Sequence, residues 1–292
     1  MADIRERFVP TNGINLHVLE AGPQDGPMIL FLHGFPDCCY AWDKQLAYFA
    51  DLGYFVVAPD QRGYNLSDKP EGIEAYRLEE LAADAIGLID FYQRSKVYLV
   101  GLDLGGLVSW WTCAHYPERF HKMVIMNCPH PNLMKANLVG NVKQMQKSWY
   151  VYFFQIAVAP EKMVSKNNFA WPVNVLGKTS RPGTFTLEEL EKYREAFAQP
   201  GACQAMINWY RAFVPTVLEN EAALKIAVPT LIFCGKNDSA LVAEQAESSA
   251  GYCENGQVIY FDDATHWVQH EEYERINPAI KRFFPCDSSL ID

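Results

Sequence analysis

The sequence predicts an α/β protein with a mostly parallel sheet flanked by helices and with an inserted helical domain. Two features lead to this prediction. Short apolar runs alternate with amphipathic segments over the first 128 residues, a pattern typical of parallel strands joined by helical crossovers. The alternation stops after Asn127, gives way to apolar residues at helical intervals, and resumes at Val228. We therefore expect residues 1–128 and 225–292 to form a core domain and residues 129–224 to form a helical cap domain.

The first half of the chain follows this pattern element by element. A β-hairpin is predicted over residues 8–20, because Asn12-Gly13 is a tight-turn pair between two strand-like runs. Continuously apolar runs predict strands buried on both faces, at residues 28–32, 54–60 and 122–127. Apolar residues at helical spacing predict helices at residues 41–52 and 78–92. A further strand, turn and helix are expected between Val97 and Tyr116.

The inserted region and the C-terminal part follow in turn. Pro and Gly interrupt the helical pattern of the insertion, which predicts several short helices broken at residues 171–172, 181–183 and 199–201. One helix is expected to start at Thr186, because Glu189 three residues later completes a capping box. After the insertion, strands are expected at residues 228–235 and 257–261, and helices at residues 242–250 and 271–284.

Composition and charge indicate which kinds of molecule the protein is expected to bind. The chain has 292 residues, of which 49% are hydrophobic, enough for a large packed core. Its 25 Lys and Arg against 35 Asp and Glu leave a formal net charge of -10. Such an acidic surface argues against nucleic acid and membrane as partners. We expect a small-molecule substrate, and the sequence leaves a homodimer open.

Targeting, disulfide and metal signals are not recognisable in the sequence. The N-terminus is charged and no long apolar segment follows it, so we expect neither a signal peptide nor a membrane span. The eight Cys lack the compact spacing of a disulfide framework, which favours reduced thiols in a cytoplasmic protein. No Cys-x-x-Cys pair suggests a metal site, and we expect none.

The segment Gly101-x-Asp103-x-Gly105-Gly106 predicts a tight turn between a strand and a helix, with Asp103 at its apex. Small residues on either side let the backbone fold back without Cβ clashes. A carboxylate nucleophile attacks carbon and forms an alkyl ester rather than an acyl-enzyme. It therefore points to epoxides or alkyl halides instead of peptides or lipids. Taken alone, the segment is also compatible with an ordinary turn carrying a solvated Asp.

Two polar residues follow the last predicted strands. Asp238 comes shortly after residues 228–235, and His266 follows residues 257–261. Because the carboxyl ends of parallel strands meet at one edge of a sheet, both side chains should lie near Asp103. His266 would act as the general base, and Asp238 would hold its other ring nitrogen.

Two backbone groups are candidates for an oxyanion hole. The loop His33-Gly34-Phe35-Pro36 follows a predicted strand and can aim the N–H of Phe35 at the site. The N–H of Leu104 lies just past the turn. Together they would hold the Asp103 carboxylate and later the charge of a tetrahedral intermediate.

With these motifs in place, the chain resembles the α/β-hydrolase-fold epoxide hydrolases over essentially its whole length. The matching segments are His33–Asp37, Arg62–Pro70, Gly101–Gly106, Pro129–Pro131, Trp149-Tyr150 and Asn208–Arg211. In this family two cap-domain tyrosines protonate the epoxide oxygen as the ring opens. The resemblance assigns these roles to Tyr150 and Tyr210, with Tyr152 as the alternative for the first. Both could instead be amphipathic core tyrosines.

The resemblance implies epoxide hydrolysis without a metal or an organic cofactor, and a small hydrophobic epoxide as the substrate. We expect contacts with that substrate from His33, Pro36, Trp149, Trp209 and Trp267. The family usually has His and Trp on either side of the nucleophile, where this chain has Leu102 and Leu104. The loss of an aromatic wall should change the shape of the pocket. A haloalkane dehalogenase-like hydrolase and a catalytically silent ligand-binding protein remain the alternatives.

Overall fold

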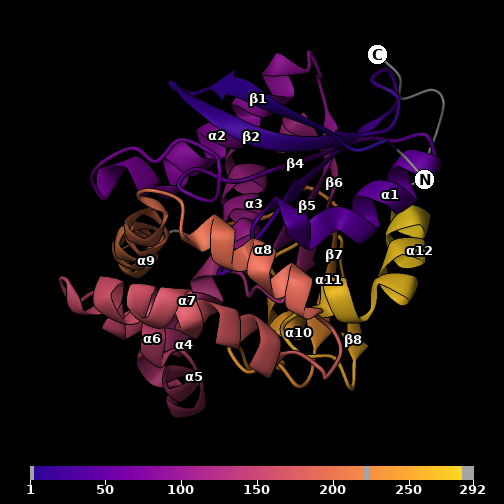
Figure 1. Cartoon of the computed structure of the whole chain (residues 1–292). Helices are drawn as coiled ribbons and strands as arrows, with labels where there is room; N and C mark the ends of the chain where they lie inside the picture. The colour runs from indigo at the N-terminus through magenta and orange to yellow at the C-terminus, as the bar shows by residue number, and fades with distance from the viewer. Residues whose placement is uncertain (1–2, 220–223, 285–292) are drawn as a thin grey trace.

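The structure is a computed structural model that describes residues 3–219 and 224–284, built around an eight-stranded sheet (Figure 1). The strand order is β1-β2-β4-β3-β5-β6-β7-β8. The pairs β1–β2 and β2–β4 are antiparallel and all other pairs are parallel, which confirms the predicted sheet. The strands are β1 (Arg5–Thr11), β2 (Ile14–Ala21), β3 (Met28–Leu32), β4 (Phe55–Pro59), β5 (Val97–Leu102), β6 (Phe120–Met126), β7 (Thr230–Gly235) and β8 (Gly256–Phe261).

Helices cover both faces of this sheet, which explains its continuously apolar strands. Successive side chains of a strand point to opposite faces. In β5, Val97 and Leu99 enter the core that is shared with α2 and α3, whereas Tyr98 and Val100 enter the core that is shared with α1 and α12. These helices and the two short ones beside them are α1 (Asp43–Asp51), α2 (Leu78–Phe91), α3 (Asp103–His115), α10 (Gln245–Ala250), α11 (Val268–Glu271) and α12 (Tyr273–Phe283).

A helical insertion separates β6 from β7. Its helices are α4 (Pro131–Gly140), α5 (Val142–Lys147), α6 (Trp149–Phe153), α7 (Ala159–Thr179), α8 (Leu187–Phe197) and α9 (Ala202–Glu219). The described residues between β6 and β7 contain no strand of the sheet. Helices α4 to α7 lie at the end of the molecule opposite β1 and β2 (Figure 1). Helix α8 starts with the predicted capping box between Thr186 and Glu189.

The ends of several elements differ from the sequence prediction. β1 starts at Arg5 because its first residues continue the ladder with β2. The predicted helix at residues 41–52 is a 3-10 turn (Cys39–Trp42) followed by α1. The predicted helix at residues 271–284 is α12, and a separate short helix, α11, precedes it. Such ends depend on hydrogen-bond partners elsewhere in the chain, which a local pattern does not contain.

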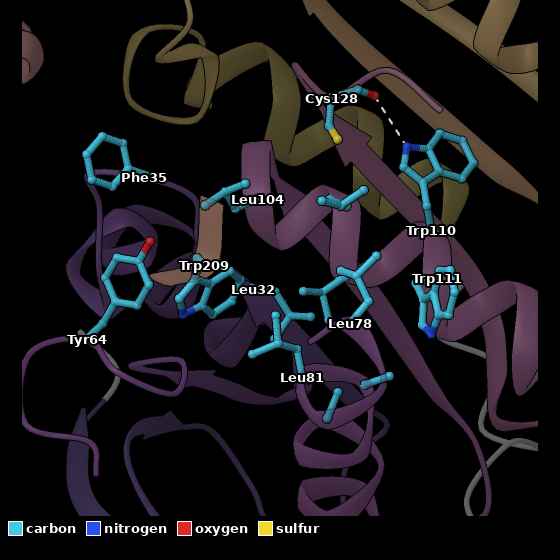
Figure 2. Packing of buried hydrophobic residues seen from close by; sticks show 14 of the residues in the cluster. Leu32, Phe35, Tyr64, Leu78, Leu81, Leu104, Trp110, Trp111, Cys128 and Trp209 are labelled. Atoms are coloured by element: carbon cyan, nitrogen blue, oxygen red, sulfur yellow. Dashed lines mark hydrogen bonds between the residues drawn. The ribbon is translucent and has the colours of Figure 1, made fainter. Parts of the chain in front are cut away.

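Helix α3 starts directly against the end of β3, and this contact shapes the turn at Asp103. A Cβ atom on Gly105 would lie 2.2 Å from the carbonyl oxygen of Leu32 and 2.4 Å from that of His33. Both obstacles are backbone, so no side chain rotation could relieve the clash. The turn itself requires a left-handed backbone at Asp103, whose φ is +50°. In the packed cluster of Figure 2, Leu104 of α3 and Leu32 of β3 lie in the same core.

The helical insertion is attached to the core domain by a buried polar contact. The indole Nε1 of Trp209 in α9 donates to the carbonyl oxygen of Arg62 at 2.8 Å, beside the ring of Tyr64 (Figure 2). The Arg62 guanidinium donates in turn to both oxygens of Asp84, at 2.6 and 2.7 Å. Because Trp209, Arg62 and Asp84 are all buried, these bonds are shielded from water and hold α9 in place.

The seven described Cys residues are all free thiols, and Cys286 lies outside the described residues. Within the described ranges, no helix combines the length and the apolar character needed to cross a bilayer.

The contact between α3 and β3 predicts the effect of adding one methyl group. Gly105→Ala should lower the free energy of unfolding by about 3 kcal/mol or more, because the added methyl overlaps backbone oxygens. Urea unfolding followed by circular dichroism measures this. Gly140→Ala is the matched control, since no atom lies within 4 Å of its added Cβ. Equal stability of the two variants would contradict this account of the turn.

Candidate active site

Asp103 lies at the carboxyl end of β5, held by backbone donors. Its Oδ1 accepts a hydrogen bond from the N–H of Phe35 at 2.9 Å, and the N–H of Leu104 also bonds the carboxylate. The two N–H groups come from the loop after β3 and from the first turn of α3. Both groups predicted for the oxyanion hole therefore contact the same carboxylate.

His266 connects Asp103 to a second carboxylate. Its Nδ1 lies 2.7 Å from Oδ2 of Asp238, and its Nε2 lies 3.6 Å from Oδ2 of Asp103. The other oxygen of Asp238 accepts from the N–H groups of Ala240 and Leu241, at 2.6 and 3.0 Å. Asp238 is thereby fixed from two sides, and it orients the imidazole so that Nε2 faces Asp103. The structure brings the three residues together at the edge where the parallel strands end.

The charges of this group shift its protonation equilibria. Burial disfavours the imidazolium, but the charge and hydrogen bond of Asp238, together with the charge of Asp103, outweigh it and raise the pKa of His266 to about 9. Burial also raises the pKa of Asp103, although His266 and the two N–H donors oppose the effect. A carboxylate that is poorly hydrated and faces a cation is well suited to attack an apolar molecule.

Tyr150 and Tyr210 lie together above this group. Their rings are 5.7 Å apart in an edge-to-face arrangement, and their hydroxyls hydrogen-bond each other. Burial, with the charge of Asp103 as a further cause, raises the pKa of both phenols, so both keep their protons at neutral pH. Tyr152 lies elsewhere: its side chain is 41% exposed and its hydroxyl donates to the carbonyl oxygen of Leu138.

A cavity of about 260 Å³ opens beside His266 and Tyr150. Its walls are mostly aromatic and include Tyr150 and His266, with Lys147 as a charged group. The described residues that line it are Phe35, Lys147, Trp149, Tyr150, Trp171, Val175, Thr179, Ser239, Ala240, His266 and Trp267. A second cavity of about 40 Å³ lies on the other side of Tyr150, where Asp103, Leu104 and Tyr210 contribute to its lining.

The residues expected to contact a substrate divide into two groups. Trp149 and Trp267 line the larger cavity. His33, Pro36 and Trp209 line neither cavity. His33 is fully buried and bonds the N–H of Gln61 through Nε2 and the carbonyl of Gly34 through Nδ1, so it holds the loop that carries Phe35. Trp209 holds α9 on the core domain, as described above.

Trp171 and Lys147 line the cavity although they are not among the site residues that the sequence predicts. Trp171 was visible only as part of a Trp-Pro break in the insertion. Lys147 follows no motif, and it reaches the site by donating from Nζ to the carbonyl oxygen of Asp238. No local signal marks either residue, because both enter the cavity through the packing of the insertion on the core domain.

Among the described residues, one group could hold a metal ion: buried His17, Cys39 and Asp60, with ligand atoms within 4.8 Å of one another. Here Nδ1 of His17 already bonds Asp60 at 2.7 Å, which accounts for the pair without an ion. His266 and His270 are four residues apart in the sequence but face different carboxylates, Asp238 and Asp37.

Comparison with known proteins identifies the family to which this chain belongs. A sequence profile of the alpha/beta hydrolase fold matches residues 27–273. The chain belongs to the α/β-hydrolase fold family. Within that family it groups with the epoxide hydrolases, which confirms the resemblance found in the sequence.

Individual relatives support this placement. The chain is 41% identical to AB hydrolase superfamily protein YfhM of Bacillus subtilis, over 97% of this chain and 99% of the relative. It is 36% identical to epoxide hydrolase 4 of Homo sapiens, over 94% of this chain and 77% of the relative. The crystal structure of an epoxide hydrolase from Bacillus megaterium superposes with a TM-score of 0.86 at 29% identity, covering 95% of this chain and 99% of that one.

The pairing of His266 with Asp238 predicts a measurable titration. Asp238→Asn keeps the hydrogen-bonding shape but removes the charge, so the pKa of His266 should fall from about 9 by about one to three pH units. Histidine NMR signals followed against pH measure the change, with the exposed Asp263→Asn as control. The folded-state pKa lies above the unfolded value of 6.5, so this stabilisation is complete below pH 6.5 and is lost as pH rises through 9. An unchanged pKa in Asp238→Asn would contradict the assignment.

Proposed function

We propose that the protein hydrolyses epoxides to vicinal diols through an ester on Asp103, with Tyr150 and Tyr210 as proton donors. The observation that carries the proposal is the position of two protonated phenols, the partly buried Tyr150 and the buried Tyr210, beside a carboxylate and its histidine partner. An epoxide is opened by a nucleophile on one carbon and an acid on the oxygen, and this site offers both. The membership of the family and the names of the relatives agree with this activity.

In the first step, Asp103 attacks an epoxide carbon. A bond forms between its Oδ2 and that carbon while the bond between carbon and the epoxide oxygen breaks. The oxygen takes a proton from Tyr150 or Tyr210. Donors placed at the leaving oxygen stabilise the transition state more than the ground state, because charge develops there only as the ring opens. The N–H of Phe35 holds the other oxygen, Oδ1, and the N–H of Leu104 also bonds the carboxylate, so the group is fixed in place for attack.

In the second step, His266 activates a water molecule that attacks the carbonyl carbon of the ester. Once Asp103 is esterified it carries no charge, so one of the causes that raise the pKa of His266 is lost. The imidazole can then lose its proton near neutral pH and act as the base. The N–H groups of Phe35 and Leu104 stabilise the tetrahedral oxyanion. As this intermediate collapses, the diol oxygen leaves with the proton that His266 took from water. The Asp103 carboxyl then ionises and returns a proton to His266, while the proton that His266 lost earlier restores the phenol.

The cavity supports a small hydrophobic epoxide as the substrate. Four aromatic residues besides Tyr150 line it, namely Phe35, Trp149, Trp171 and Trp267, and a volume of about 260 Å³ suits a compact aryl or alkyl group. No step requires a metal or an organic cofactor. In this proposal residues 129–224 act as the cap domain that carries both phenols, and residues 1–128 and 225–292 carry the nucleophile, base and acid. Residues 220–223 and 285–292 of these ranges lie outside the described residues.

The ester mechanism predicts where water oxygen goes. With enzyme in excess over styrene oxide in H₂¹⁸O, the first turnover should place ¹⁸O in the carboxylate of Asp103 and leave the diol unlabelled. Mass spectrometry of the peptide that contains Asp103 and of the diol measures both. Asp103→Asn should form no diol. If an active enzyme puts the label into the diol during the first turnover, water attacks directly and the mechanism is wrong.

The phenols predict a difference between epoxides and haloalkanes. Tyr150→Phe and Tyr210→Phe should each lower the rate of ester formation from an epoxide about 10–100-fold, because one of two donors is lost. Stopped-flow kinetics measure this rate. Tyr152→Phe is the matched control and should retain the wild-type rate, since Tyr152 lies outside the cavity. Halide release from haloalkanes that exceeds epoxide turnover would favour a dehalogenase, and inactivity on both would favour a ligand-binding protein.

A further inference from the structure

Residues 139–158 carry an unusual number of exposed apolar side chains. Seven large hydrophobic residues in this segment are between 37% and 70% exposed: Val139, Val142, Met145, Trp149, Tyr152, Ile156 and Val158. Only eight others of this kind occur in the rest of the described chain. Exposed apolar residues that are scattered singly are ordinary, whereas a concentration of them marks a contact surface. We call these seven side chains the apolar surface.

The apolar surface is formed by the neighbouring helices α4, α5 and α6 and by the segment between α6 and α7, which carries Ile156 and Val158. α4, α5 and α6 lie together at the end of the molecule that is opposite β1 and β2 (Figure 1). The hydroxyl of Tyr152 in α6 donates to the carbonyl of Leu138 in α4, and Asn141 between α4 and α5 bonds the side chain of Asn137. These contacts fix α4, α5 and α6 against one another and bring their exposed residues onto one part of the surface.

The charge around this surface differs in sign from that of the whole protein. Residues 129–187 contain seven Lys or Arg and a single acidic residue, Glu161. The remaining sequence contains 18 Lys or Arg and 34 Asp or Glu. Glu161 is paired with Arg211 at 2.6 Å, so its charge is compensated. Lys143 approaches Glu244 at 3.9 Å in an exposed pair, which is a weak interaction in water. The net charge of -10 therefore conceals a basic region in the helical insertion.

We propose that the apolar surface docks on a bilayer that contains anionic phospholipid. Exposed Val, Met and Ile side chains would enter the boundary between headgroups and acyl chains, where Trp149 and Tyr152 also favour the interface. Lys135 and Lys143 would contact lipid phosphates while their alkyl stems lie along apolar surface. Exposed apolar side chains together with a local excess of basic over acidic residues are the combination that such a bilayer attracts.

The charges argue against a second copy of the chain as the occupant. In a symmetric dimer the same patch meets itself, so the lysines would face lysines with one compensated glutamate among them. Nucleic acid would leave seven apolar side chains without a partner. An anionic bilayer complements both the charge and the apolar residues.

Docking would also bring the entrance of the cavity to the lipid surface. The benefit of this position for catalysis rests on the proposed function. Trp149 is 49% exposed and at the same time lines the larger cavity, as does Lys147. The cavity therefore reaches the surface beside the docking face. Hydrophobic epoxides partition into membranes, so a docked enzyme would take its substrate directly from the lipid.

Sedimentation with sucrose-loaded vesicles tests the docking. The full chain should bind vesicles of phosphatidylcholine with 30% phosphatidylglycerol at least about tenfold more strongly than pure phosphatidylcholine, at an expected gain of about fivefold per lysine at the surface. Val142→Asp/Met145→Asp should lose this binding at least about tenfold. Leu187→Asp/Ile4→Asp adds the same charge at exposed apolar positions elsewhere and should bind like the wild type. Circular dichroism confirms that both variants fold.

Three results would overturn the proposal: no binding to anionic vesicles, equal loss in both double variants, or a lipid-free dimer that Val142→Asp/Met145→Asp abolishes. Turnover of soluble styrene oxide without lipid separates this test from that of the proposed function. Vesicle binding without turnover supports docking and refutes the activity. Turnover without vesicle binding does the reverse.

Discussion

The arrangement of the site depends on the close contact between the start of α3 and the end of β3. Gly105 lies against the carbonyl oxygens of Leu32 and His33, so the helix begins at the sheet edge with no side chain between them. This contact forces a left-handed backbone at Asp103 and directs its carboxylate toward the N–H of Phe35 on the next loop. The Asp103 carboxylate is thus positioned by backbone packing, which is stiffer than a chain of side-chain contacts.

Electrostatics then determine how that carboxylate behaves. Asp103 is buried, which raises its pKa, and His266 between two carboxylates has a pKa raised to about 9. Each group influences the others, so neutralising Asp103 alters His266. The proposed mechanism uses this coupling: the same imidazole pairs with the nucleophile before reaction and loses part of its stabilisation once the ester forms. In this mechanism the loss of the Asp103 charge therefore links formation of the ester to its hydrolysis.

The insertion contributes other side chains to the site than the core domain does. It supplies both phenols and two of the four other aromatic residues that line the cavity, and Trp209 attaches it to Arg62 of the core domain. Its basic charge and its exposed apolar residues set it apart from an otherwise acidic molecule. If the insertion also contacts a bilayer, substrate capture and proton donation are carried by one structural unit.

By itself the sequence determined the order of strands and helices, the turn at Asp103, and the positions of Asp238 and His266 after their strands. These features depend on local patterns, namely continuous apolar runs, glycines around one carboxylate, and polar residues where strands end. Only the tertiary structure decided that Tyr150 rather than Tyr152 lies beside Asp103, that Trp171 and Lys147 line the cavity, and that His33 and Trp209 hold loops and helices. Tyr150 and Tyr152 lie on the same helix and face different directions. Which of the two faces the site is set by the surface against which the helix packs.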